Sequence, residues 1–220
     1  MSTVEHGLIA GSDQVAAVVG ALAASTCRLL LGASRPGRAV GALVTVRQDR
    51  FVLASSLLEP AAVSPALAIA RGELADLPSE ACTIVDEIVD YLAVPPTPVA
   101  PGRSTPLPVE DALMLAEQLR RGDPTHLDEA LDLSGLGRAP DWLMDLAPGA
   151  QASLTAAFVD ERGIELLADL TATPHGWGEL LCTDDEILTF DPMTEDDVRA
   201  RLGQACDLLV TRTLDADRAA

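Results

Sequence analysis

The sequence predicts an α+β fold that combines a central antiparallel sheet with helical layers. Three observations lead to this prediction. Apolar residues at three- and four-residue spacing mark amphipathic helices in both halves of the chain. Short runs rich in valine, leucine and isoleucine, bounded by turn residues, mark paired strands. The 220 residues are 48% hydrophobic, enough to bury one substantial core or two small ones.

The first half is predicted to hold a helix, a strand and a hairpin. Ser12 and Asp13 have short oxygen-bearing side chains that can cap a helix running to about Ala24. A strand over 27–33 and a turn over 34–38 are expected next. Residues 40–46 and 51–57 are then expected to pair through the turn 47–50.

Prolines organise the end of this half. Pro60 stops the second hairpin strand, and Pro65 is tolerated only in the first turn of a helix, so a helix is expected after it. Another helix begins at Ser79. We expect it to bury Ile84, Val85, Ile88 and Leu92 and to expose Asp86, Glu87 and Asp90.

The segment Val94–Pro108 carries six prolines and is predicted to be an extended connector, because proline lacks an N–H and restricts its predecessor. A ligand for SH3-like domains is the functional alternative. The connector divides the chain into an N-terminal α/β subdomain (1–93), the connector itself (94–107) and a C-terminal α/β subdomain (108–220).

The second half is predicted to open with helices and continue as strands. A helix over 108–121 is striped by Val109, Ala112, Leu113, Ala116 and Leu119. Thr125 is expected to cap a second helix, and Pro140-Asp141 to begin a third. Strands are expected over 152–159, 164–171, 177–183 and 186–190. Thr194 then caps a final helix with core positions Val198, Leu202, Ala205 and Leu209.

The two halves share a local pattern. In each, a strand leads to an acidic residue, a proline and a helix: Glu59-Pro60 in the first and Asp191-Pro192 in the second. Two related units around a pseudo-two-fold axis would produce this repeat, and so would chance.

Charge excludes several classes of partner. Arginine supplies all 15 basic residues, and with 34 acidic residues the net charge is −19. Residues 110–220 carry 24 of the acids and 8 arginines, a net charge of −16. A field of this sign repels phosphate backbones and anionic lipids, so we expect no nucleic-acid partner and no membrane insertion. The charge either keeps this protein soluble or helps to keep an aggregation-prone client soluble.

Motifs for catalysis are scarce, and we expect no enzymatic activity, no metal and no cofactor. The chain has no lysine, which excludes Schiff-base chemistry, and its three histidines lack partners at metal-ligand spacing. His175 and Cys182 are the one conceivable nucleophilic pair, without a third member. A hydrolase built on two carboxylates stays open as an alternative. Four cysteines without a CxxC pair favour reduced, buried thiols and a cytoplasmic location.

A leucine cluster among the short helices of the second half is the candidate partner-binding surface. Short helices with this much leucine favour some apolar surface left for a partner, rimmed by Asp128, Asp132, Asp141 and Asp145. The alternative is that the cluster packs on the sheet, in which case a non-enzymatic, homodimeric structural or regulatory domain is the competing function. The predicted binding residues are Leu127, Leu131, Leu136, Trp142 and Leu143.

The stretch Leu115–Gly137 (LAEQLRRGDPTHLDEALDLSGLG) resembles the helix–loop–helix region of the EspG family, the cytosolic chaperones of type VII (ESX) secretion. The order of elements after it is similar too: strands at 154–159 and 165–172, the segment from Trp177 to Phe190, then Asp191-Pro192 and a closing helix. Relative to that family, the strand and helices before the Ser12 helix are missing, so a chain shortened at its N-terminus is expected.

The resemblance implies a central sheet with two helical bundles in pseudo-two-fold halves. It also implies a function: binding and masking the apolar tip of a PE–PPE heterodimer in the cytosol until the secretion machinery takes this substrate. The implied binding surface corresponds to residues 108–147 and 194–212.

Overall fold

The computed structural model describes residues 4–9, 20, 27–58, 66–92 and 105–219. The helix predicted over 12–24 and most of the predicted connector lie outside these residues. The chain divides into two compact units. The first comprises residues 1–93, 154–169 and 199–220, and the second comprises residues 94–153 and 170–198. Antiparallel sheet and helices together confirm the predicted α+β class.

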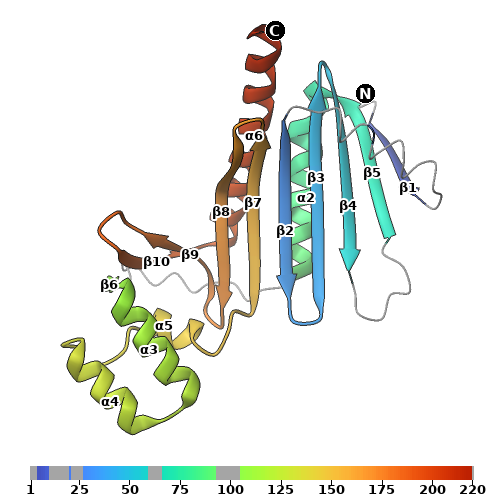
Figure 1. Ribbon diagram of the computed structural model, residues 1–220. Coiled ribbons are helices and arrows are strands. Elements are labelled where there is room, and N and C mark those ends of the chain that lie inside the picture. Colours follow the sequence, from blue (N-terminus) through green and yellow to red (C-terminus); the bar gives the residue numbers. More distant parts are fainter. Residues whose placement is uncertain (1–3, 10–19, 21–26, 59–65, 93–104, 220) are drawn as a thin grey trace. The chain divides into compact units, whose positions relative to one another are not determined.

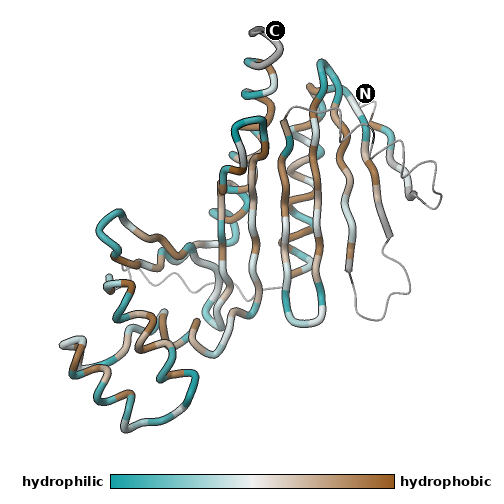
Figure 2. Tube along the Cα trace, viewed as in Figure 1, coloured by the Kyte–Doolittle hydropathy of each residue, from teal (hydrophilic) through white to brown (hydrophobic). Residues whose placement is uncertain are grey.

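In the described part of the first unit, antiparallel strands follow the order β1-β5-β4-β3-β2, and β7 comes next in the hydrogen-bonded order (Figure 1). Val44 stands opposite Leu29 on one neighbouring strand and Leu53 on the other, and all three are buried. Figure 2 shows hydrophobic residues along the middle of these strands and hydrophilic residues at their turns. Their bounds are β1 (Glu5–Ile9), β2 (Arg28–Arg35), β3 (Arg38–Arg47), β4 (Arg50–Leu58) and β5 (Ala66–Glu73).

Two expectations for this unit are wrong. The segment after Pro65 is the strand β5 and no helix, because it is hydrogen-bonded between β1 and β4. Among the described residues, this strand lies between Glu59-Pro60 and the next helix in the sequence. Moreover, β1 supplies a strand ahead of residue 12, where a missing strand was expected.

Two long helices cover one face of this sheet. After the short 3-10 turn η1 (Leu74–Asp76), α2 (Leu77–Leu92) lies against the sheet behind β2 and β3 (Figure 1). The helix α6 (Glu195–Ala219) buries the predicted stripe of Val198, Leu202, Ala205 and Leu209. Arg199 of α6 reaches two acids of α2, with 2.7 Å from its Nε to Asp86 and 3.3 Å from its Nη2 to Asp90. The two helices therefore lie side by side.

The compact units do not follow the predicted division at the connector. β7 (Ala152–Asp160) is next to β2 in the strand order, so most of it belongs with the first half of the chain. Thr155 Oγ1 donates a hydrogen bond of 3.4 Å to the carbonyl of Gly32. Sheet pairing and the packing of α6 thus recruit segments of the C-terminal half into the first unit.

The second unit holds three shorter helices and a small antiparallel sheet. β8 (Gly163–Thr173) runs from the first unit into this one, and its last four residues pair with β9. A turn at Asp184-Asp185, as predicted, joins β9 to β10. The remaining elements are β6 (Leu107–Pro108), α3 (Val109–Arg121), α4 (Pro124–Leu133), α5 (Asp141–Leu146), β9 (Gly176–Cys182) and β10 (Ile187–Met193).

Thr194 caps the start of α6, as predicted. The hydrogen bonds at this cap lead us to expect that the stability of the protein depends on pH. Asp197 accepts hydrogen bonds from the Thr194 hydroxyl (2.6 Å) and N–H (2.9 Å), and these bonds, that of the hydroxyl above all, hold the pKa of its carboxyl below the ordinary value. The carboxylate therefore contributes stability above about pH 3.9, which is lost as the pH falls through the lower folded pKa. When the urea midpoint of unfolding is measured as a function of pH, Asp197→Asn is expected to reduce its fall at acid pH. An unchanged fall would contradict this.

The four cysteines are free, but only two are buried. Cys27 and Cys206 are buried as expected, whereas Cys82 and Cys182 are exposed, contrary to the prediction. Burial, then the charges of Asp207 and Cys82, raise the pKa of the Cys206 thiol to about 12. Because the thiolate is the reactive form, Cys206 is protected twice, by its burial and by its protonation.

We expect a thiol reagent at pH 8 to modify Cys82 and Cys182 rapidly in the native protein and to leave Cys27 and Cys206 intact. Peptide mass spectrometry after a short pulse with iodoacetamide measures the order of labelling. The urea-unfolded protein, in which all four should react alike, is the control. Rapid labelling of Cys206 in the native state would show that α6 does not pack as described.

Candidate functional site

The candidate site is built on α3, α4 and α5 of the second unit. Gly122 ends α3 in the left-handed conformation (φ 68°), which glycine adopts without strain, and its N–H bonds to the Gln118 carbonyl. The chain then turns directly into α4. This short connection places the start of α4 beside the end of α3, and the two helices pack together.

Asp123 caps α4, two residues before Thr125, which was the predicted cap. Its side chain accepts hydrogen bonds from the N–H groups of Thr125 (3.0 Å) and His126 (3.4 Å), and Pro124 occupies the first helical position. The His126 ring lies 2.7 Å from the second carboxyl oxygen of Asp123. This side-chain bond, together with the bonds from the backbone, holds the pKa of the Asp123 carboxyl below its ordinary value.

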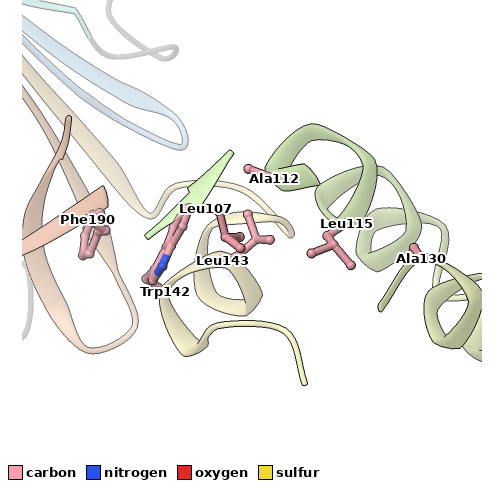
Figure 3. Close-up of a cluster of buried hydrophobic side chains, with 7 residues drawn as sticks. All are labelled: Leu107, Ala112, Leu115, Ala130, Trp142, Leu143 and Phe190. Atoms are coloured by element: carbon pink, nitrogen blue, oxygen red, sulfur yellow. The ribbon is translucent and has the colours of Figure 1, made fainter. Parts of the chain in front are cut away.

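A compact apolar cluster joins the three helices to β6 and β10 (Figure 3). The rings of Trp142 and Phe190 stack at 6.4 Å between centroids with 11° between their planes. The Trp142 indole N–H donates a hydrogen bond of 3.1 Å to the carbonyl of Thr105, which leaves no unsatisfied donor in the cluster's aromatic pair. The buried members are Leu107, Ala112, Leu115, Ala130, Trp142, Leu143 and Phe190.

The five predicted binding residues separate into two groups. Trp142 and Leu143 are 7% and 5% exposed and form the interior of the cluster. Leu127, Leu131 and Leu136 are half-buried at its margin. The cluster brings all five together, but it gives only the marginal leucines a surface that a partner can touch.

Two leucines outside the five predicted binding residues are the most exposed leucines among the described residues of this unit. Leu133, the last residue of α4, is 79% exposed, and Leu113 of α3 is 61% exposed. Leu113 was expected in the core stripe of α3, but the cluster receives Leu115, which is fully buried. The stripe through Ala112, Leu115 and Leu119 has the same helical spacing, and this alternative was readable from the sequence.

Acidic side chains surround the helices as expected, and some are engaged. Arg138 pairs with Asp141, and His175 Nε2 lies 3.6 Å from a carboxyl oxygen of Asp145. Asp128 and Asp132 are exposed on α4. Around the marginal leucines, the surface therefore combines acidic side chains with apolar ones. Such a surface suits a partner that presents apolar and basic groups.

Within the described residues, the side chains that could take part in catalysis or metal binding do not come together in one site. Within them, no group of three or more His, Cys, Asp or Glu residues is placed to hold a metal ion. His126 is exposed and bonded to Asp123, while Cys182 and His175 lie at opposite ends of β9. Within the same ranges, no helix is long and apolar enough to cross a membrane.

Comparison with known proteins gives this chain no family assignment. No protein-family model matches its sequence, and no curated protein sequence is significantly similar to it.

Proposed function

We propose that the chain is a non-enzymatic chaperone that binds an apolar surface of another protein through the α3–α5 helices. The observation that carries the proposal is the pair of exposed leucines, Leu113 of α3 and Leu133 of α4, on the helices that also carry the half-buried Leu127 and Leu131. A partner that covered these leucines together would bury an apolar patch of the kind that marks interaction sites. The acids around them favour solubility before the partner arrives.

We further propose that the client is the apolar tip of a PE–PPE type heterodimer, masked in the cytoplasm before type VII secretion. Two kinds of support exist for this client. One is the resemblance of Leu115–Gly137 to the EspG helix–loop–helix. The other is the observed order of α3, α4, four strands and a long closing helix, which is the order expected of that family. The two bundles of such a fold would be α2 with α6, and α3 with α4 and α5.

Co-expression with PE–PPE pairs tests the proposal. The tagged chain is expected to capture a pair with one-to-one stoichiometry on affinity and size-exclusion columns. Leu113→Asp with Leu133→Asp is expected to weaken capture at least about tenfold, because two charges replace apolar contacts. Ile164→Asp, at an equally exposed apolar residue of the first unit, is the matched control.

Three results would contradict the proposal: no pair captured, capture unaffected by the double substitution, or an equal loss in the Ile164 variant. Sedimentation at several protein concentrations distinguishes the proposed chaperone from the competing function, a homodimeric structural or regulatory domain. A tight homodimer disrupted by the same double substitution would assign these leucines to self-association.

A further inference from the structure

The outer edge of β8 is an open strand edge of the first unit. In the hydrogen-bonded order β8 follows β7 and is the last strand of that unit (Figure 1). On its other side β9 pairs only with residues 170–173, so no described strand pairs with the outer edge along residues 163–169. The backbone N–H and C=O groups of such an edge form hydrogen bonds with a further strand, so the occupant that fits is an extended backbone.

Two apolar side chains on this stretch are exposed. Ile164 is 76% exposed and Leu166 is 60% exposed, and both point to one face because side chains alternate along a strand. Glu165 lies between them and points to the other face, where its carboxylate is 2.7 Å from Arg212 of α6. The apolar side chains therefore lie on the face opposite to α6. An edge strand that presents apolar side chains pairs readily with another strand.

The open stretch is complementary to a second copy of itself. Leu166 is the central residue of 163–169, so two antiparallel copies related by a two-fold axis at Leu166 pair over the whole stretch, from the turn after β7 to the start of the β9 pairing. In this register Leu166 stands opposite Leu166 of the second copy, and Ile164 stands opposite Ala168. The exposed apolar side chains of both copies would then form one continuous strip.

The acids of the stretch favour the same register. With the axis at Leu166, Glu165 stands opposite Leu167, and Asp169 stands opposite Gly163, so no two acids face each other. An axis one residue earlier would place Glu165 against Glu165, and an axis one residue later would place Glu165 against Asp169. Like charges directly opposite each other on neighbouring strands are destabilising. Charge therefore selects the register that also joins the apolar side chains.

We propose that β8 pairs with β8 of a second copy of this chain, which joins the sheets of two first units into one continuous antiparallel sheet. Such an interface is isologous, since each copy contributes the same residues. It uses no residue of α3, α4 or α5, so the inference does not rest on the proposed function. A dimer that holds one client per chain also retains the one-to-one ratio expected above.

Sedimentation velocity of the full chain over a range of concentrations tests for the dimer. The mass is expected to rise from 23.0 kDa toward twice that value, in about 0.3 M salt to screen the repulsion between acidic copies. Leu166→Arg is expected to raise the dissociation constant at least about tenfold, because two like charges would face each other. Leu133→Arg, at a leucine of α4 that is 79% exposed, is the control and should leave the dimer unchanged. Far-UV circular dichroism verifies that both variants fold.

Cysteine cross-linking tests the register. The background is Cys82→Ser with Cys182→Ser, which removes the two exposed thiols. Under oxidised glutathione, Leu166→Cys is expected to form an intermolecular disulfide at least about fivefold faster than Ile164→Cys, because only residue 166 faces its own copy at disulfide distance. Exposure alone would give the opposite order, since Ile164 is more exposed than Leu166. Non-reducing gel electrophoresis measures both rates.

Four outcomes would overturn the inference. They are a chain that stays monomeric at about 0.5 mM, a dimer that survives Leu166→Arg, a dimer that Leu133→Arg weakens equally, and faster cross-linking through residue 164 than through residue 166. A monomeric chain that captures a PE–PPE pair would refute this inference and leave the proposed function standing. A β8 dimer that captures no pair would do the reverse.

Discussion

Replacing Trp142 by alanine is expected to destabilise the second unit by about 3–5 kcal/mol, the range for removing a large aromatic residue from a core. Trp142 is 7% exposed, stacks on Phe190 and donates a hydrogen bond to the Thr105 carbonyl. The substitution loses all three interactions and leaves a cavity among short helices. Urea unfolding followed by far-UV circular dichroism measures the change.

Trp142→Phe separates the contributions to this effect. It retains a ring against Phe190 but lacks the indole N–H, so an intermediate loss of stability is expected. Leu133→Ala, at a residue that is 79% exposed, is the control and should change stability by less than about 0.5 kcal/mol. A Trp142→Ala protein as stable as the control would mean that the aromatic pair is not part of a packed core.

Gly178→Ala is expected to destabilise the β9–β10 hairpin and the cluster beside it by about 1–3 kcal/mol, the usual cost of overpacking. Gly178 is buried on β9, directly opposite Pro192 of β10. A methyl group there would overlap the Phe190 ring, so the ring must shift and its stacking on Trp142 is disturbed. The methyl group added to residue 178 would therefore displace Phe190, which is two residues from Pro192, the pairing partner of Gly178.

The combination of Gly178→Ala with Phe190→Leu tests this mechanism. If the overlap with the ring causes the loss, the glycine substitution should cost less once the ring is gone, and a double-mutant cycle would show a coupling of about 1 kcal/mol or more. Gly203→Ala, where a Cβ meets no atom within 4 Å, is the control. Additive effects of the two substitutions would contradict the proposed contact.

Local patterns identified most elements of the fold. Val40–Val46 and Phe51–Leu57 lie in the hairpin β3–β4, and the four strands predicted after residue 150 are β7 to β10 within a few residues. Thr194 caps α6, whose stripe through Val198, Leu202 and Leu209 is buried as predicted. Period-two and period-3.6 patterns suffice in these cases because the apolar face that each produces is the face that is buried.

The strand after Pro65 shows where local patterns are insufficient. Residues 66–70 alternate small and large apolar side chains, a pattern compatible with a strand or a short buried helix. The choice depends on β1 and β4, whose backbones pair with both edges of the segment. Hydrogen-bond partners from distant parts of the chain cannot be read from the segment itself.

The sequence by itself determined that this is an acidic α+β protein with no motif for lysine-, metal- or nucleotide-dependent chemistry, and it located the leucines of the second unit. Only the tertiary structure decided which of them lie inside: Trp142 and Leu143 are core residues, while Leu113 and Leu133 reach the surface. The physical reason is that helical spacing defines a face, whereas burial depends on what packs against that face.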